Sequence, residues 1–222
     1  QAYLVPDGGA DAGPAAQDVA LTALRSVAEE LGTAALGRVR HRLVVTHPVT
    51  AEDRAFLAAA GVSATVVPDA DGVLHAPVAS LLADAVTVCL GAGPAGDPWA
   101  AVRSALSHPD PDERISARSA FAAATRTPLR ALPDAPAARL SVAPRLSVSA
   151  PAVFGVWDAD AVAVQSPDGR VAAWSTDTRA GTPLLPALDA ETALPRWRAT
   201  WVDGRIAAED VARDAHDAAT PA

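Results

Sequence analysis

Three residues that can bind a metal ion or move a proton each follow an apolar, strand-like run in this sequence: His47, Asp7 and Asp97. In β/α proteins the reacting groups stand at the carboxyl ends of parallel strands. One imidazole and two carboxylates at such an edge would form a loose divalent-metal site. We favour a structural interpretation, in which His47 is a loop histidine, Asp7 a turn residue and Asp97 the N-cap of a helix that starts at Pro98.

The element that must position His47 is the stretch from His41 to Asp53. It reads as a buried strand followed directly by a helix. The hydroxyl of Thr50 is a good N-cap acceptor, and Asp53, three residues later, favours a capping box near the positive helix end. The stretch therefore predicts one β/α unit.

This strand-and-helix alternation continues over the first 132 residues and indicates a parallel α/β architecture. Four β/α units are half of an eight-stranded barrel. They leave open sheet edges that need covering. The predicted strands are Gln1–Val5, His41–Thr46, Ser63–Val67 and Val86–Leu90, and the predicted helices are Pro14–Leu31, Thr50–Ala60, His75–Ala85, Pro98–Ser107 and Ser116–Thr127.

The pattern changes after Pro128, where prolines mark a linker and short strand-like runs follow. We expect three regions: a barrel half over 1–132, a small β domain over 133–208 and a flexible tail over 209–222. The expected short strands are Val153–Trp157, Val162–Val164, Val171–Trp174 and Trp197–Val202, with hairpin turns at Asp168-Gly169 and Asp203-Gly204.

Composition excludes several classes of function. The net charge of −8 argues against a nucleic-acid partner, which requires a basic surface. The single cysteine, Cys89, rules out an internal disulfide and reads as a buried small hydrophobe. We find no bilayer-spanning stretch and no signal peptide, and we expect a cytoplasmic protein without membrane contact. Gln1 already lies in strand-like sequence, which we interpret as a piece of a longer protein or a processed product.

Several segments occur in the order typical of one enzyme family, and the chain resembles the amidohydrolase superfamily, specifically its N-substituted formamide deformylase branch. The resemblance implies the C-terminal half of a TIM-like (β/α)8 barrel, strands five to eight, followed by part of a small β domain. It also implies hydrolysis of non-peptide C–N bonds with zinc or another divalent metal. The matching segments are Arg40-His41-Arg42-Leu43, Val49-Thr50-Ala51-Glu52-Asp53, Leu90-Gly91, Asp97-Pro98-Trp99, Arg114-Ile115-Ser116-Ala117-Arg118, Ala152–Asp158 and Trp201–Arg205.

The same resemblance identifies replaced metal ligands. Val45 stands where the family has the strand-six histidine, Leu4 falls near the strand-five histidine, and Gly93 or Ala92 replaces the strand-eight aspartate. No His-x-His pair and no lysine occur. His47 lies two residues beyond Val45 and would share its face of the strand. We therefore expect no metal and no cofactor in this chain. The other histidines, His41, His75, His108 and His216, have no metal-ligand spacing with one another.

Two hypotheses of function remain open. The first is a degenerate pseudoenzyme, non-catalytic alone, that acts as a structural or regulatory partner of another protein chain or as a self-dimer covering the open barrel edges. In it, Val45 points into the barrel and packs on Leu4 and Val67. The alternative is a metal-dependent hydrolase of C–N bonds that an N-terminal part or a partner chain completes.

Overall fold

The computed structural model describes residues 1–6, 13–133, 148, 150–165, 174–175 and 184–210. The chain forms two compact units, Gln1–Ser141 and Val142–Ala222. The predicted residue Asp7, the turn Asp168-Gly169 and the start of the predicted strand Val171–Trp174 lie outside the described residues.

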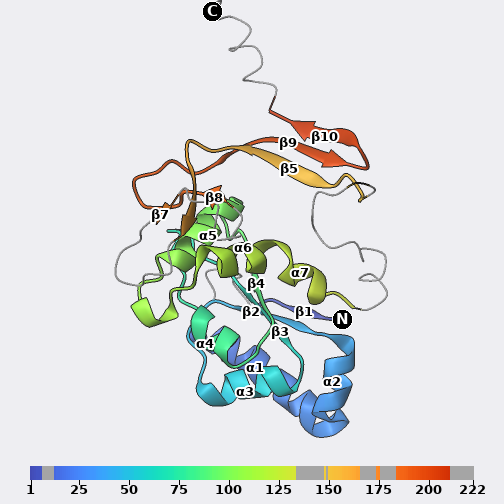
Figure 1. Cartoon of the computed structure of the whole chain (residues 1–222). Coiled ribbons are helices and arrows are strands. Elements are labelled where there is room, and N and C mark those ends of the chain that lie inside the picture. Colours follow the sequence, from blue (N-terminus) through green and yellow to red (C-terminus); the bar gives the residue numbers. More distant parts are fainter. Residues whose placement is uncertain (7–12, 134–147, 149, 166–173, 176–183, 211–222) are drawn as a thin grey trace, which may run out of the picture. The chain divides into compact units, whose positions relative to one another are not determined.

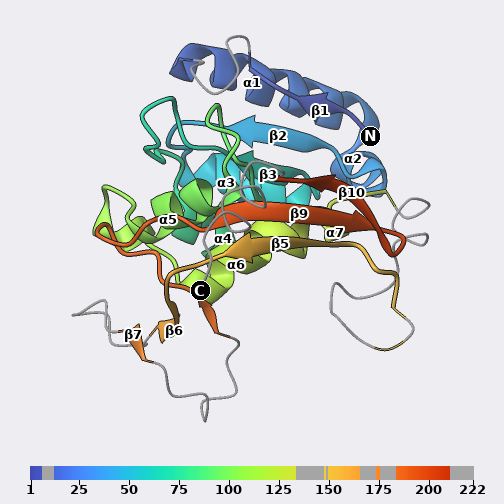
Figure 2. The ribbon, with the colours of Figure 1, turned by 90° about the horizontal axis from the view of Figure 1, so that it is seen from above.

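A four-stranded parallel sheet organises the first unit, with the strand order β1-β2-β3-β4. Figure 2 shows β1, β2 and β3 following one another across this sheet. The parallel α/β architecture predicted from the sequence is therefore confirmed. The strands are β1 Tyr3–Leu4, β2 Arg42–Val45, β3 Ser63–Val66 and β4 Val88–Leu90.

Helices cover both faces of this sheet. Figure 1 shows α1, α3 and α4 on one face and α5, α6 and α7 on the other. The first three connect neighbouring strands, and right-handed crossovers in a sheet of sequential order place such helices on the same side. The helices are α1 Pro14–Leu31, α2 Thr33–Val39, α3 Ala51–Ala59, α4 Val78–Ala83, α5 Pro98–Leu106, α6 Ala117–Thr125 and α7 Thr127–Arg130.

The two faces of the sheet differ in polarity, because neighbouring residues of a strand point to opposite sides and paired residues share a side. The register pairs Leu43 with Ala64 and Val45 with Val66, and it pairs Ala64 with Val88. This apolar face consists of Leu4, Leu43, Val45, Ala64, Val66, Val88 and Leu90. The opposite, mixed face consists of Tyr3, Arg42, Val44, Ser63, Thr65 and Cys89.

Helix α2 is absent from the sequence prediction, which had taken Gly32 as the end of helical structure. Gly32 does end α1, with φ 83°, but α2 begins at the next residue. A Cβ built on Gly61, whose φ is 58°, would lie 3.1 Å from the Cα of Gly37 in α2. Two glycines thus allow the backbones of α2 and the end of α3 to approach closely.

The helix predicted over His75–Ala85 is shorter in the structure, where α4 spans Val78–Ala83. Pro77 is the N-cap residue of α4, and its side chain cannot accept a hydrogen bond from the first turn of the helix. Glu113, from the segment after α5, accepts hydrogen bonds from the backbone nitrogen and the hydroxyl of Ser80. This distant carboxylate therefore satisfies the amino end of α4, and His75 belongs to the preceding loop.

The described residues of the second unit form two three-stranded antiparallel sheets, with orders β10-β9-β5 and β7-β6-β8. Figure 2 shows β9 between β10 and β5. Asp203 and Gly204 join β9 to β10 with φ values of 50° and 76°, which confirms the predicted hairpin turn. Glu209, assigned from the sequence to the tail, is the last residue of β10. The strands are β5 Phe154–Asp158, β6 Val162–Gln165, β7 Trp174–Ser175, β8 Leu185–Pro186, β9 Arg196–Val202 and β10 Arg205–Glu209.

Candidate functional site

A buried glutamine of α1 holds the turn that carries His47. The Oε1 of Gln17 accepts hydrogen bonds from the backbone nitrogens of Thr46, at 2.9 Å, and His47, at 3.1 Å. Its Nε2 donates to the carbonyl oxygens of His47 and Pro48 at 3.3 and 3.4 Å. Gln17 is only 1% exposed. A single side chain therefore pairs the buried backbone nitrogen of Thr46 and the part-buried backbone groups of His47 and Pro48.

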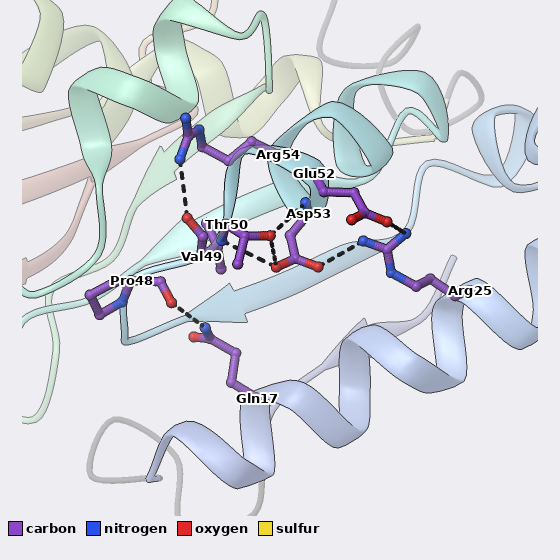
Figure 3. Close-up of polar contacts among 8 residues, drawn as sticks. All are labelled: Gln17, Arg25, Pro48, Val49, Thr50, Glu52, Asp53 and Arg54. Carbon is purple, nitrogen blue, oxygen red and sulfur yellow. Dashed lines mark hydrogen bonds and ion pairs between the residues drawn. The ribbon is translucent and has the colours of Figure 1, made fainter.

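The helix after this turn begins with the predicted capping box. The hydroxyl of Thr50 accepts from the backbone nitrogen of Asp53, and the Asp53 carboxylate accepts from the backbone nitrogen of Thr50. Arg25 of α1 lies 2.8 Å from the same carboxylate (Figure 3). Burial raises the pKa of Asp53, but the hydrogen bonds from Thr50 and Arg25 outweigh it and lower the pKa below its usual value. The box fixes where α3 starts.

A cluster of polar side chains, among them two histidines and an aspartate, lies at the carboxyl edge of the sheet, in the loops after β2 and β3. The Nε2 of His75 is 2.9 Å from Oδ2 of Asp69. The rings of His75 and His47 are nearly parallel, at 17°, with centroids 6.5 Å apart. The Nδ1 of His47 is 3.0 Å from the hydroxyl of Thr46. We call Asp69, His75, His47 and Thr46 the edge cluster.

Asp69 also organises the loop that carries His75. Its Oδ1 accepts from the backbone nitrogens of Asp71 and Val73 at 3.0 and 2.8 Å. The backbone hydrogen bond from Val73 and the contact with His75 lower the pKa of Asp69, while burial opposes them. The hydroxyl of Ser104 in α5 donates to the carbonyl of Gly72 at 2.6 Å and anchors the loop. The Asp69 carboxylate is therefore ionised and fixed beside the imidazole.

Asp69 and His75 were not predicted from the sequence to form a pair. His75 was expected to start a helix, and the strand expected over Ser63–Val67 ended before Asp69. The available signal was that both follow the same predicted strand and precede the next helix, where parallel α/β proteins gather functional groups. Across the described ranges, no group of three or more histidine, cysteine, aspartate or glutamate side chains is arranged to hold a metal ion.

The structure separates the three candidates named from the sequence. His47 belongs to the edge cluster. Asp97 is the N-cap of α5, and its carboxylate accepts from the backbone nitrogens of Trp99 and Ala100 at 2.8 and 3.3 Å. This is the capping role that we favoured for it. Asp7 lies outside the described residues.

Gly93, one of the two positions expected to replace the strand-eight aspartate, has no room for a side chain. Its φ is 66°, and a Cβ built on it would lie 2.8 Å from the carbonyl oxygen of Pro68 and 2.9 Å from its ring. Glycine adopts this conformation without the cost that other residues incur. The loop after β4 therefore packs directly against the loop after β3.

Val45, at the other replaced position, is fully buried on the apolar face beside its register partner Val66. Leu4 shares that face through its pairing with Leu43. The expected contact with Val67 is wrong, because a Cβ built on Gly91 would meet the side chains of Val67 and Thr65. Val67 therefore points to the mixed face, as strand alternation from Val66 requires.

Cys89 lies on the mixed face and is 1% exposed. Burial raises the pKa of its thiol, and Arg42 opposes this shift only in part. A thiol that stays protonated is a poor nucleophile, which agrees with the expectation of a buried small hydrophobe.

None of the helices in the described part of the chain is long and apolar enough to cross a bilayer.

Comparison with known proteins gives few matches. No family model and no curated protein matches the sequence. A solved structure of a triazine hydrolase variant aligns with a TM-score of 0.46 and 19% sequence identity. The alignment covers 86% of this chain and 41% of the hydrolase chain. A TM-score of 0.46 does not establish a shared fold. The function of this chain is therefore argued from its own residues.

Proposed function

We propose that this chain is a degenerate amidohydrolase-like half, formed by the second half of a TIM-like barrel and a small β domain. It does not perform metal-dependent hydrolysis alone and acts as a structural or regulatory partner of another chain or of a second copy. The proposal rests on the order of the matching segments along the sequence, on the sequential parallel sheet and on the replaced ligand positions.

The observation that carries the proposal is the chemistry at Val45 and Gly93. An aliphatic side chain has no lone pair to offer a metal, and Val45 is 0% exposed among other aliphatic residues. The closely packed Pro68 fills the space that a side chain at Gly93 would need. Both positions therefore contribute to packing. A single substitution at either one would not produce a side chain that is correctly placed to bind a metal ion.

The role as a partner is supported by a difference between the two edges of the sheet. All three residues of β4 are buried, whereas Tyr3 and Val5 at β1 are 53% and 50% exposed. In the described part of the chain, β1 pairs only with β2. An exposed strand edge with apolar side chains pairs readily with another chain.

Sedimentation velocity of the purified chain tests the role as a partner. We expect a dimer at micromolar concentration, or a monomer that associates when the natural partner is added. Replacing Val5 with lysine adds a charge beside the β1 edge and should weaken the association, whereas Val153→Lys in the second unit provides a control at another exposed valine. A parent chain that stays monomeric with every candidate partner would contradict the proposal.

Elemental analysis tests the loss of the metal site. We expect far less than one zinc, iron or manganese ion per chain after dialysis. About one ion per chain, lost on His47→Ala, would overturn this expectation.

The alternative, a metal-dependent hydrolase of C–N bonds completed by an N-terminal part or a partner chain, is favoured by one observation. His47 and His75 lie together at the carboxyl edge, where ligands supplied by another chain would have to converge. Under this alternative, metal content and amide hydrolysis would appear together only in the assembled complex.

A further inference from the structure

We infer that Asp69 and His75 form a metal-independent proton-transfer pair, in which His75 acts as a general base toward water that attacks small activated carboxylic esters. This inference goes beyond the proposed function, since it uses neither the replaced ligand positions nor a partner chain.

The first support is the tautomer that Asp69 imposes on His75. A carboxylate accepts hydrogen bonds and cannot donate them, so the 2.9 Å contact places the proton of the neutral ring on Nε2. The lone pair is then on Nδ1. A carboxylate that fixes the tautomer in this way also stabilises the imidazolium that forms when the base takes a proton.

The second support is the rigidity of the pair. Asp69 uses its other oxygen to bind the backbone nitrogens of Asp71 and Val73, and Ser104 anchors the same loop through Gly72. The nearly parallel ring of His47 stands beside His75, and Thr46 and Gln17 hold it in turn. General-base catalysis requires such fixed geometry.

The third support is access. The side chain of His75 is 48% exposed, and that of Asp69 is 26% exposed. Among the described residues, none forms a hydrogen bond with Nδ1 of His75. Water and a small ester can therefore reach the base while the carboxylate behind it is partly shielded.

Hydrolysis by this pair requires water and the ester and no other reactant. The water O–H bond breaks and its proton passes to Nδ1 of His75, while the water oxygen forms a bond to the ester carbonyl carbon. The resulting intermediate collapses, the bond from that carbon to the leaving oxygen breaks, and the alkoxide or phenolate leaves with the electron pair. His75 then returns its proton to the leaving group or to solvent. A base acting alone suits esters with good leaving groups, and this defines the substrate class.

The test measures hydrolysis of 4-nitrophenyl acetate by the full chain in the presence of EDTA. We expect His75→Gln to lower the second-order rate constant at least tenfold. Asp69→Asn should do the same. Its amide oxygen can still accept from Asp71 and Val73, but its NH2 group faces His75 Nε2 and forces the proton onto Nδ1, which blocks the base. Glu29→Gln removes an equal charge from an exposed position of α1 and should stay within twofold of the parent.

Nitrogen NMR of the His75 ring provides a readout apart from activity. We expect a protonated Nε2 and an unprotonated Nδ1 in the parent at high pH, and the reverse in Asp69→Asn. Should Asp69→Asn fail to fold, the parent spectrum and His75→Gln decide. A parent rate that His75→Gln leaves unchanged, a rate abolished by EDTA, or a parent with the proton on Nδ1 would overturn the inference. None of these results alters the sedimentation or metal analysis, so the proposed function fails or stands separately.

Discussion

The side-chain oxygen of Gln17 lies 3.1 Å from the backbone nitrogen of His47, so a residue in α1 fixes the turn at the end of the next strand. The same side chain also serves Thr46 and Pro48. Because Gln17 is 30 residues away from His47 along the chain, this contact couples the first β/α unit to the second.

Replacing Gln17 with alanine should destabilise the first unit by roughly 2–4 kcal/mol, because the buried backbone amide of Thr46 and the part-buried amide of His47 lose their acceptor. Urea denaturation followed by circular dichroism measures the change. Asp18→Ala, at the exposed neighbouring position, is the control and should change stability by no more than about 0.5 kcal/mol. Equal effects of the two substitutions would show that the turn does not depend on Gln17.

Asp53 should make stability depend on pH in the acid range. Its folded-state pKa is lowered from 3.8, so the unfolded chain binds the proton more readily than the folded chain. The stabilisation by the carboxylate is therefore complete above about pH 5 and is lost as the pH falls through the lowered pKa. The difference in the free energy of unfolding between the parent and Asp53→Asn should shrink between about pH 5 and pH 2. A difference independent of pH would contradict the role of the charge.

Thr50→Ala should cost about 1 kcal/mol, because the first turn of α3 loses its N-cap acceptor. Thr50→Ser keeps the hydroxyl and should recover most of this loss. Thermal unfolding of both variants measures the effect, and equal melting temperatures would exclude the hydroxyl as the cause.

Gly93→Asp should destabilise the chain without creating a zinc site. The new side chain would have to adopt φ 66° and would collide with Pro68, at a cost of about 1–3 kcal/mol for the backbone conformation alone. Gly96→Asp is a matched control, since Gly96 has φ 68° but open space around its Cβ position. The excess loss at Gly93, measured by denaturation with and without zinc, isolates the clash. A Gly93 variant that zinc stabilises would sink the interpretation of this loop as pure packing.

Val45→His should lower the melting temperature, and added zinc should not restore it. The substitution places a polar ring in the apolar face beside Val66, which costs on the order of 1–3 kcal/mol if the ring stays unpaired. Thermal melting of parent and variant with and without zinc gives the answer. A melting temperature that rises with zinc in the variant alone would mean that other ligands still converge on this position.

The sequence by itself determined the four strands and most of the helices of the first unit, although it missed α2, because local signals agree at those elements. Pro14 and Gly32 bound α1 as predicted, and Thr50 and Asp53 form the predicted capping box. Apolar runs closed by turn residues located the four strands, and their alternation with helices gave the parallel sheet. Such signals act over a few residues and need no knowledge of distant partners.

Only the tertiary structure decided which polar residues meet. Asp69 and His75 are joined by a loop that the sequence had assigned in part to a helix, and His47 reaches them from another β/α unit. Glu113 satisfies the amino end of α4 from 33 residues away, which no local pattern indicates. The side of the sheet that Val67 faces likewise depended on the exact strand register, because a shift of one residue reverses every side chain. Contacts between distant residues are set by packing, and local sequence patterns do not encode them.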